Sequence, residues 1–285
     1  MYYILYNPLS SNGKSVEILK TVETRLTNEG HSFSSLDIIE VSKNIETFLK
    51  QIKEEDKVVI LGGDGTLHRF ANAIRYINYK NEIFLYKGGT GNDFSREFKK
   101  QQLINITSYV RDLPRFKADD HQELVFLNGV GFGLDGAVCN AVNETVGKKK
   151  NAFEYVKKLL STIKKFPRYD LELVVDGVRH SYKNVWLTTV NNGKYFGGGM
   201  KISPLSDRTD DILEVTVVHT VSFLKLLCIF PFIFIGKHLW FKKQGVSVLK
   251  GRKFTLTASS PQPLQGDGEV IENVREIVVE IDEKK

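Results

Sequence analysis

Several absences narrow the class of protein to which this chain can belong. It has only two cysteines, Cys139 and Cys228, which lie far apart in apolar surroundings. A disulfide framework is therefore excluded, and we expect reduced core thiols in a cytoplasmic protein. The N-terminus has neither a basic leader nor a long apolar run, so we expect a first β-strand there and no signal peptide. Repeats, low-complexity tracts and long linkers are also lacking.

The longest apolar stretch is too short to cross a bilayer. Between Phe223 and Phe241 the uncharged core covers residues 226–235, Pro231 interrupts it, and Lys225 and Lys237 flank it. A membrane span needs about 20 consecutive apolar residues. We therefore predict a buried helix. A shallow contact with the bilayer interface stays open, because apolar residues flanked by lysine suit that boundary.

Composition and charge fit a globular protein with an anionic partner. Hydrophobic residues make up 41% of the 285-residue chain and charged residues 26%, which is typical of a soluble globular protein. The net charge of +6 and the pI near 9.0 suit a nucleotide, an acidic membrane surface or a nucleic acid. Nothing resembles a base-reading helix or a stacking platform, so we do not expect a nucleic-acid partner.

The first part of the chain alternates between strand and helix patterns. Apolar spacing predicts strands at 2–6, 32–38, 57–61 and 83–86, and helices at 15–29, 44–52 and 66–77. The near-continuous apolar run at 57–61 is typical of a parallel strand covered on both faces. We predict an open, twisted α/β domain that binds its ligands at the carboxyl ends of the strands.

From about residue 117 the pattern changes to short strands separated by turns. Strands are predicted at 123–127, 169–175, 181–190, 213–218, 246–249, 253–258 and 275–281, with helices only at 152–165 and 221–235. This pattern favours an antiparallel sandwich or barrel. We therefore expect an α/β domain over residues 1–118, a β-sandwich domain over residues 119–285, and a cleft between them.

The most informative segment is the glycine corner Gly62-Gly63-Asp64-Gly65-Thr66. It follows the apolar strand at 57–61 and enters a helix. Glycines let a ligand approach the bare backbone, and amides at a helix N-terminus form a seat for phosphate. A carboxylate such as Asp64 would repel phosphate unless a cation lay between them, so it indicates Mg²⁺. The alternative is a structural corner in which Asp64 caps the helix.

Two further polar loops follow strands of the same predicted sheet. A second glycine corner at 88–94 contains Thr90, Asn92 and Asp93, and the loop at 7–14 offers hydroxyls, a lysine and the start of a helix. Each loop alone could be structural. Three polar loops at strand ends of one domain favour a shared ligand.

These motifs, with others in order behind them, resemble the diacylglycerol kinase catalytic-domain family of lipid kinases, and its soluble bacterial branch fits best. The resemblance covers essentially the whole chain. It rests on NP-x-S-x-x-GK at 7–14, GGDGT at 62–66, GTGNDF at 89–94, the glycine-rich segment 128–135, the segment 191–199 with Pro204, DDILEV at 210–215, GKH at 236–238 and DGE at 267–269.

The resemblance implies phosphoryl transfer from ATP to a lipid hydroxyl with magnesium, most simply from diacylglycerol to phosphatidic acid. An alcohol needs a general base, and by position this is Glu269, with Asp267 beside it and Asp64 facing the phosphates and the catalytic Mg²⁺. Nucleotide binding is assigned to Asn7, Ser10, Gly13, Lys14, Gly62, Gly63, Asp64, Gly65, Thr66, Gly89, Thr90, Asn92 and Asp93.

The family also implies a structural magnesium ion. Its ligands here would be the Asp210 carboxylate and the backbone carbonyls of Asp207 and Ile212, with Asp119 linked to the site indirectly. This sequence departs from the family pattern at His68-Arg69, Lys87 and Asp211, where the family usually has Asn-Glu, proline and glycine. These departures leave the details of nucleotide and metal binding open.

Basic residues suggest how such an enzyme would reach its substrate. Lysines at 148–150, 157–158 and 164–165 lie on or beside the predicted helix 152–165. They are typical of an ordinary amphipathic helix, and they would also suit docking on anionic lipid. We expect a cytoplasmic enzyme in peripheral contact with the inner membrane face, and a homodimer stays open.

Other functions remain as alternatives. An NAD kinase shares GGDG and a two-domain plan. A sphingoid base, undecaprenol or phosphatidylglycerol could replace diacylglycerol as acceptor. A non-catalytic lipid or nucleotide sensor would account for the departures at His68, Arg69 and Asp211.

Overall fold

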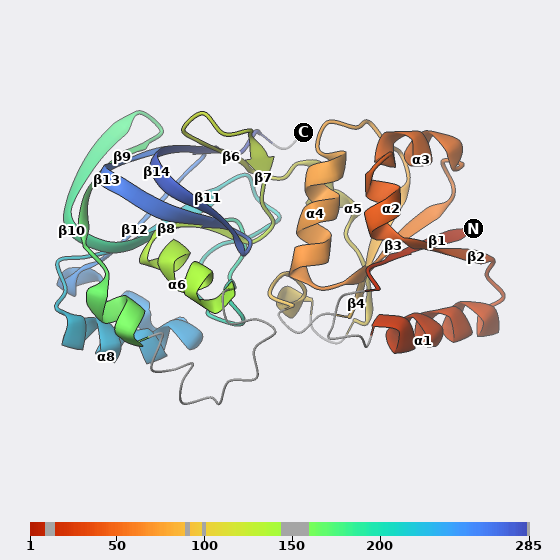
Figure 1. Cartoon of the computed structure of the whole chain (residues 1–285), viewed down its shortest axis with the longest axis horizontal. Helices are drawn as coiled ribbons and strands as arrows, with labels where there is room; N and C mark the ends of the chain where they lie inside the picture. The colour runs from red at the N-terminus through yellow and green to blue at the C-terminus, as the bar shows by residue number, and fades with distance from the viewer. Residues whose placement is uncertain (9–14, 89–91, 99–100, 144–159, 284–285) are drawn as a thin grey trace. The chain divides into compact units, whose positions relative to one another are not determined.

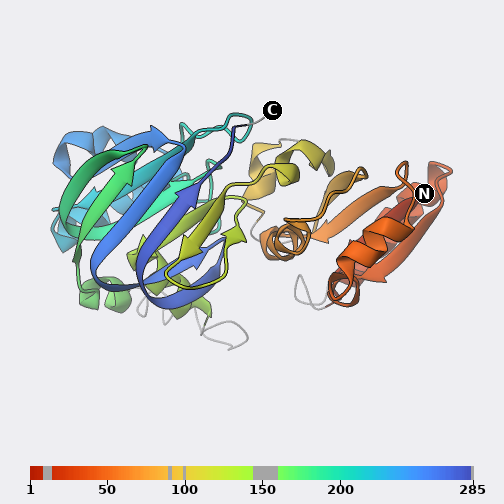
Figure 2. The same cartoon turned by 90° about the horizontal axis from the view of Figure 1, so that it is seen from above.

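The chain divides into two compact units, Met1–Leu113 and Pro114–Lys285 (Figures 1 and 2). The computed structural model describes residues 1–8, 15–88, 92–98, 101–143 and 160–283. The division lies slightly before the boundary at residue 118 that the sequence suggested. The reason is that β6 (Arg115–Ala118) pairs with β14 (Glu269–Glu280) and so belongs to the second sheet.

The N-terminal unit is an open α/β sheet, as predicted, and its strand order is β2-β1-β3-β4-β5, with β5 a strand that was not predicted. The first four strands in this order are parallel, and β5 is antiparallel to β4. The elements are β1 (Tyr2–Tyr6), α1 (Ser15–Asn28), β2 (Phe33–Asp37), α2 (Ile38–Ser42), α3 (Ile45–Gln51), β3 (Lys57–Gly62), α4 (Asp64–Ile74), β4 (Glu82–Lys87), η2 (Phe94–Glu97), β5 (Leu103–Asn105) and α5 (Thr107–Arg111).

Helices cover both faces of this sheet, which accounts for its apolar strands. The buried side of α1, with Leu19, Val22 and Leu26, packs in one cluster with Val59 and Leu61 of β3. Figure 1 shows α2, α3 and α4 on the opposite face. Strand β2 ends at Asp37, because the Asp37 side chain accepts a hydrogen bond from the backbone N–H of Ile39 and caps α2.

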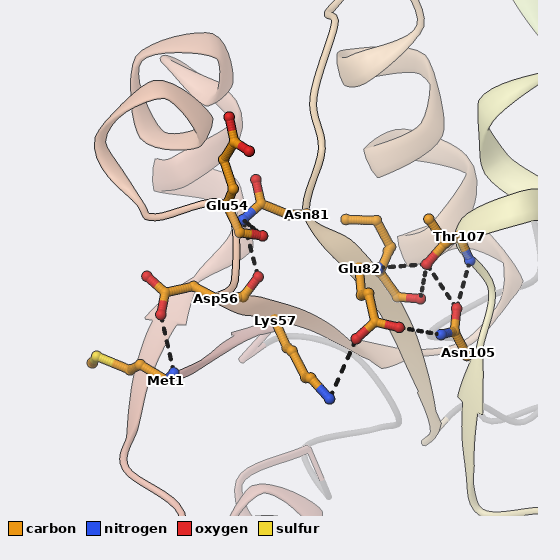
Figure 3. Close-up of polar contacts among 9 residues, drawn as sticks. Met1, Glu54, Asp56, Lys57, Asn81, Glu82, Asn105 and Thr107 are labelled. Carbon is orange, nitrogen blue, oxygen red and sulfur yellow. Dashed lines mark hydrogen bonds and ion pairs between the residues drawn. The ribbon is translucent and has the colours of Figure 1, made fainter.

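Polar contacts tie the amino ends of β3 and β4 together (Figure 3). The buried Asn81 side chain donates to the carbonyls of Lys53 (2.7 Å) and Asp56 (2.9 Å). The Asp56 carboxylate pairs with the Met1 amino group at 3.0 Å. These contacts fix the amino ends of β1, β3 and β4 relative to one another.

The C-terminal unit is an antiparallel sandwich, as predicted. Its strand order is β12-β11-β10-β8-β13-β14-β6-β7, with β9 paired to both β10 and β13. Its remaining elements are β7 (Leu124–Val125), β8 (Gly129–Gly133), α6 (Leu134–Asn143), β9 (Tyr169–Val175), β10 (Val178–Asn191), β11 (Leu213–His219), α8 (Phe223–Phe234), η3 (His238–Gln244), β12 (Val246–Gly251) and β13 (Lys253–Gly266).

Two long strands create the two layers of the sandwich. Strands β10 and β13 each pair with β9 along one half and with β8 along the other. Both strands have register shifts between these halves, which let a strand turn from one layer into the other. The core between the layers contains fully buried side chains such as Phe132, Leu173, Val217, Phe254 and Ile277.

The helices of this unit cover the outer face of one layer. Leu226 and Ile229 of α8 pack with Leu134 of α6 and Val246 of β12. Helix α8 was predicted to be buried, but only one side of it is, because Leu224, Phe234 and Cys228 are exposed. Within the described residues no helix is long and apolar enough to cross a membrane.

Candidate active site

The carboxyl ends of β1, β3 and β4 lie side by side in the N-terminal unit. Leu61 of β3 is level with Tyr6 of β1 and with Tyr86 of β4, so the loops that follow all leave the same edge of the sheet. The backbone N–H of Gly88 donates to the Gly62 carbonyl at 3.1 Å. Of the predicted nucleotide residues, Ser10, Gly13, Lys14, Gly89 and Thr90 lie outside the described residues.

The Asp64 carboxylate joins the two glycine corners. Asp64 is the first residue of α4, and its two oxygens accept hydrogen bonds from the backbone N–H groups of Asp93 (2.7 Å) and Phe94 (3.0 Å). Asp93 is itself buried and pairs with Arg96 at 3.2 Å. Both oxygens of the Asp64 carboxylate therefore bond to the backbone of the second corner. The structure thus brings the predicted residues Asp64, Asn92 and Asp93 together.

The glycines of the first corner differ in what surrounds them. A Cβ added at Gly62 would lie 2.6 Å from the Cβ of Thr66, so glycine is required there by packing. A Cβ added at Gly65 would meet no described atom within 4 Å. Gly65 lies in the first turn of α4, where N–H groups point outward and the helix dipole favours an anion. The open space at Gly65 is consistent with a ligand that approaches the backbone.

Two departures from the family pattern have structural roles. His68 is buried on α4, and its ring Nε2 and backbone carbonyl contact the side-chain amide of Asn72 (3.3 and 3.1 Å). Lys87, at the end of β4, donates to the Phe98 carbonyl at 2.8 Å. His68 is therefore a buried residue of α4 that bonds within the helix. Lys87 links the end of β4 to the backbone that follows the second corner.

In the C-terminal unit, Asp267 and Gly268 form the turn between β13 and β14. Both have positive φ, 46° and 99°, as a two-residue Asp-Gly hairpin requires. The Asp267 carboxylate accepts from the backbone N–H groups of Leu127 (2.5 Å), Asn128 (2.8 Å) and Gly129 (3.2 Å). The carboxylate thus anchors the hairpin to the start of β8, while Glu269, the next acidic residue, is exposed.

A cysteine thiol lies beside this hairpin. Cys139 Sγ lies 3.3 Å from the Gly268 carbonyl. Burial raises the pKa of the Cys139 thiol to about 11, and the negative charges of Asp135 and Glu269 add to the shift. At neutral pH this cysteine is therefore a thiol rather than a reactive thiolate.

Asp135, in the first turn of α6, is a half-buried acid at the end of the glycine-rich segment 128–135, and its motif alone indicates no role for it. Its carboxylate accepts from the Gln265 side-chain amide at 2.7 Å and fills the space above Gly131, which a Cβ there would occupy. Burial raises the pKa of Asp135 to about 7, and the hydrogen bond from Gln265 opposes this shift. Near neutral pH the group can therefore either hold or release a proton.

The predicted metal residues lie in the turn before β11. Asp210 Oδ1 accepts from the Ile212 N–H at 3.1 Å, and the Asp207 carboxylate accepts from the N–H and hydroxyl of Thr209 (2.9 and 2.6 Å). The extra carboxylate, Asp211, pairs with Arg252 at 2.5 Å. The Asp119 carboxylate accepts from the backbone amides of Arg275 (3.0 Å) and Glu276 (2.8 Å).

This turn offers oxygen donors of the type that Mg²⁺ prefers. One carboxylate and two carbonyls would make a sparse site, and Mg²⁺ commonly keeps several waters in such sites. Within the described ranges there is no cluster of three or more histidine, cysteine, aspartate or glutamate side chains that could hold a metal. The oxygen donors of Asp210, Asp207 and Ile212 fit magnesium in type. Asp211 adds little negative charge to this turn, because Arg252 pairs with it.

Sequence reasoning missed a buried arginine in the same region. Arg208 donates to the Leu127 carbonyl and to Asn128 Oδ1 (2.6 Å), and Asn192 donates to the same Leu127 carbonyl at 3.3 Å. Residues 127–129 are thus held by Arg208 from one element and by Asp267 from another. The only signal for Arg208 in the sequence is an arginine between aspartates, which normally indicates an exposed loop.

The raised pKa of Asp135 predicts a pH-dependent stability. Its pKa rises from 3.8 to about 7 on folding, so its protonation stabilises the fold fully below pH 3.8, and this contribution is lost as the pH rises through about 7. The variant Asp135→Asn cannot ionise and should gain melting temperature relative to the native protein as the pH rises from about 4 to 8. Thermal denaturation across this range tests it, and a constant difference in melting temperature would contradict it.

Comparisons with known proteins agree with the motifs. Residues 1–118 match the family model described as the diacylglycerol kinase catalytic domain, and residues 128–281 match the YegS C-terminal NAD kinase beta sandwich-like domain. The chain is 26% identical to "Putative lipid kinase YtlR" of Bacillus subtilis, over 95% of this chain and 93% of that one. It is 27% identical to a diacylglycerol kinase of Mycobacterium tuberculosis, over 82% and 78%.

Solved structures show the same fold. A diacylglycerol kinase of Bacillus anthracis aligns with a TM-score of 0.64 at 20% identity, over 98% of this chain and 93% of that one. Yeast NADH kinase in complex with NADH aligns with a TM-score of 0.52 at 12% identity, over 99% and 80%. In the present chain, the two family models match consecutive segments that together cover almost its whole length. The chain therefore belongs to the diacylglycerol kinase catalytic-domain family.

Proposed function

We propose that this protein is an ATP-dependent lipid kinase that transfers the γ-phosphate to a lipid hydroxyl, with diacylglycerol as acceptor and phosphatidic acid as product. The observation that carries the proposal is the Asp64 brace between the two glycine corners, with the bare backbone of Gly65 beside it. Together they supply a phosphate seat and a carboxylate at one sheet edge. The family membership supports the kinase reaction and the lipid acceptor.

The N-terminal unit would hold the nucleotide. Amides in the first turn of α4 would bind phosphate oxygens, and Lys14 and Thr90 would add a positive charge and a hydroxyl. Asp64 would orient the magnesium-bound phosphates. When bound, Mg²⁺ neutralises the charge that develops on the transferred group, and Asp210, with the carbonyls of Asp207 and Ile212, would hold a structural ion.

Glu269 would act as the general base. It takes the proton of the acceptor hydroxyl, whose oxygen forms a bond to the γ-phosphorus. The bond from that phosphorus to the β,γ-bridging oxygen breaks, and ADP leaves with the electron pair. Asp267 would be a positioning residue, because its carboxylate is committed to three backbone amides that hold the hairpin carrying Glu269.

The decisive experiment is a transfer assay with radiolabelled ATP against a panel of acceptors. The panel contains diacylglycerol, sphingosine, undecaprenol and phosphatidylglycerol in detergent micelles, and NAD in solution. We expect label in phosphatidic acid. Label in NADP alone would replace the proposal with an NAD kinase, which the fold of the yeast enzyme makes a real competitor. ATP binding without transfer to any acceptor would indicate a sensor.

Replacing the proposed base should stop the reaction without unfolding the protein. Because Glu269 is exposed, Glu269→Gln should keep its melting temperature and its affinity for ATP. Its kcat should fall by roughly 10²-fold or more, since general bases contribute about that factor.

The matched control is Glu272→Gln, an exposed glutamate on the same strand whose carboxylate contacts Asn140. It should retain full turnover. Native-like turnover in Glu269→Gln would remove Glu269 from the mechanism.

A second variant separates phosphate binding from folding. Gly65→Ala adds one methyl group where no described atom lies within 4 Å, and alanine in a helix is more stable than glycine by about 1 kcal/mol. We expect equal or higher stability in urea denaturation together with an affinity for ATP that falls by about tenfold. An unchanged affinity for ATP by calorimetry would show that the nucleotide does not approach this backbone.

A further inference from the structure

Helix α8 and the turn η3 expose an apolar surface that the fold does not need. Along α8 the exposed residues recur at helical spacing, so they form one outward stripe. Leu224 is 71% exposed and Trp240, in η3, is 67% exposed. We call this set the α8 surface; it consists of Leu224, Cys228, Pro231, Phe234, Ile235 and Trp240.

The opposite side of α8 is buried and packs against the sheet. Leu226 and Ile229 pack against the sheet with Val218 and Val246, and the Ser222 side chain caps the helix at the Lys225 N–H. The helix is therefore fixed by its inner side and its cap. Contiguous apolar residues that remain exposed on a protein mark an interaction site.

Aromatic contacts make α8 and η3 a single surface. The Phe232 ring lies 6.3 Å from the Trp240 ring and 5.4 Å from the Phe241 ring, in an edge-on arrangement with the latter. Phe230 and Phe234 stack edge-to-face along the helix at 5.6 Å. These contacts hold the η3 turn against the end of α8, so Trp240 extends the apolar stripe.

Every charged side chain in the segment that forms this surface is positive. Residues 221–244 contain four lysines, at 225, 237, 242 and 243, and neither aspartate nor glutamate. Lys237, Lys242 and Lys243 are exposed, and the Lys237 ammonium lies 4.8 Å from the centre of the Trp240 ring. An apolar stripe with a lysine fringe and an exposed tryptophan complements the headgroup region of an anionic bilayer.

We propose that the α8 surface docks on an anionic lipid bilayer, with α8 lying in the plane of the interface. Its 12 residues span about 18 Å, well short of the roughly 30 Å of a hydrocarbon core, so the helix rests on the bilayer rather than crossing it. The inference rests on the proposed function, which gives the protein a reason to dock: the acceptor of a lipid kinase lies in a membrane. Vesicle binding tests it without any catalysis.

The test is cosedimentation of the full chain with phosphatidylcholine vesicles that contain or lack phosphatidylglycerol. Leu224→Glu and Ile235→Glu place a charge on exposed positions and should weaken binding by at least about tenfold, because the apolar face no longer inserts. Lys242→Ala with Lys243→Ala should weaken binding to anionic vesicles by roughly thirtyfold and leave binding to neutral vesicles little changed.

The matched control is Val178→Glu. Val178 begins β10 in the same unit and is 60% exposed, similar to Ile235 at 58%. It should bind vesicles like the native protein. Equal vesicle binding by Leu224→Glu, Ile235→Glu and the native chain would overturn the proposal.

Measurements of kinase activity distinguish this inference from the kinase proposal, and the oligomeric state tests whether a second copy of the chain covers the surface. On a water-soluble short-chain diacylglycerol, the α8 variants should work like the native enzyme. A native chain that binds vesicles through α8 but phosphorylates no lipid would refute the kinase and keep the docking surface. A native dimer that Ile235→Glu converts to monomers, with vesicle binding unchanged, would show that a second copy covers this surface.

Discussion

The candidate nucleotide site depends on one carboxylate, that of Asp64, which bonds to the backbone of a second loop. The backbone bond from Gly88 to Gly62 joins the corners after β3 and β4 where they begin, and the Asp64 carboxylate adds a second link by holding the N–H groups of Asp93 and Phe94 against the start of α4. The same device recurs in the other unit, where Asp267 holds residues 127–129 and Asp176 holds the amides of Arg252 and Lys253. Hydrogen bonds to a charged group are worth about 1.5–3 kcal/mol each, so short aspartates fix these loops firmly.

Most of the fold could be predicted because apolar side chains recur along its strands and helices at the spacing typical of each. The apolar runs of β1 and β3 and the period of α1 predicted the N-terminal sheet. Strand β8 escaped prediction because alternate residues are glycines, and the space beside them is filled from elsewhere: Asn191 lies against Gly129, and Asp135 against Gly131. Only Val130 and Phe132 contribute apolar side chains to β8, so its alternation is too short to distinguish a strand from a glycine-rich loop.

The candidate site was predictable as a set of motifs but not as a set of roles. The motifs located Asp64, Asp267 and Glu269, yet a sequence does not distinguish a carboxylate that anchors backbone from one that meets a substrate. The structure shows only how their surroundings differ: Asp64 and Asp267 accept hydrogen bonds from backbone amides, and Glu269 is exposed. Arg208 escaped prediction for a related reason: its burial depends on the Leu127 carbonyl, which lies far away in the sequence.

The apolar run of α8 shows why hydropathy alone could not assign its environment. A helix that is apolar all round can be buried, or it can present one side to protein and the other to lipid, and the sequence is the same in both cases. The structure shows that Leu226, Ile229 and Ile233 are covered by protein and that Leu224 and Ile235 are exposed. Lysines at both ends would hold such a helix parallel to a charged surface. Because the hydroxyl of a lipid alcohol lies at headgroup depth, a kinase resting there would reach it without drawing the acyl chains into water.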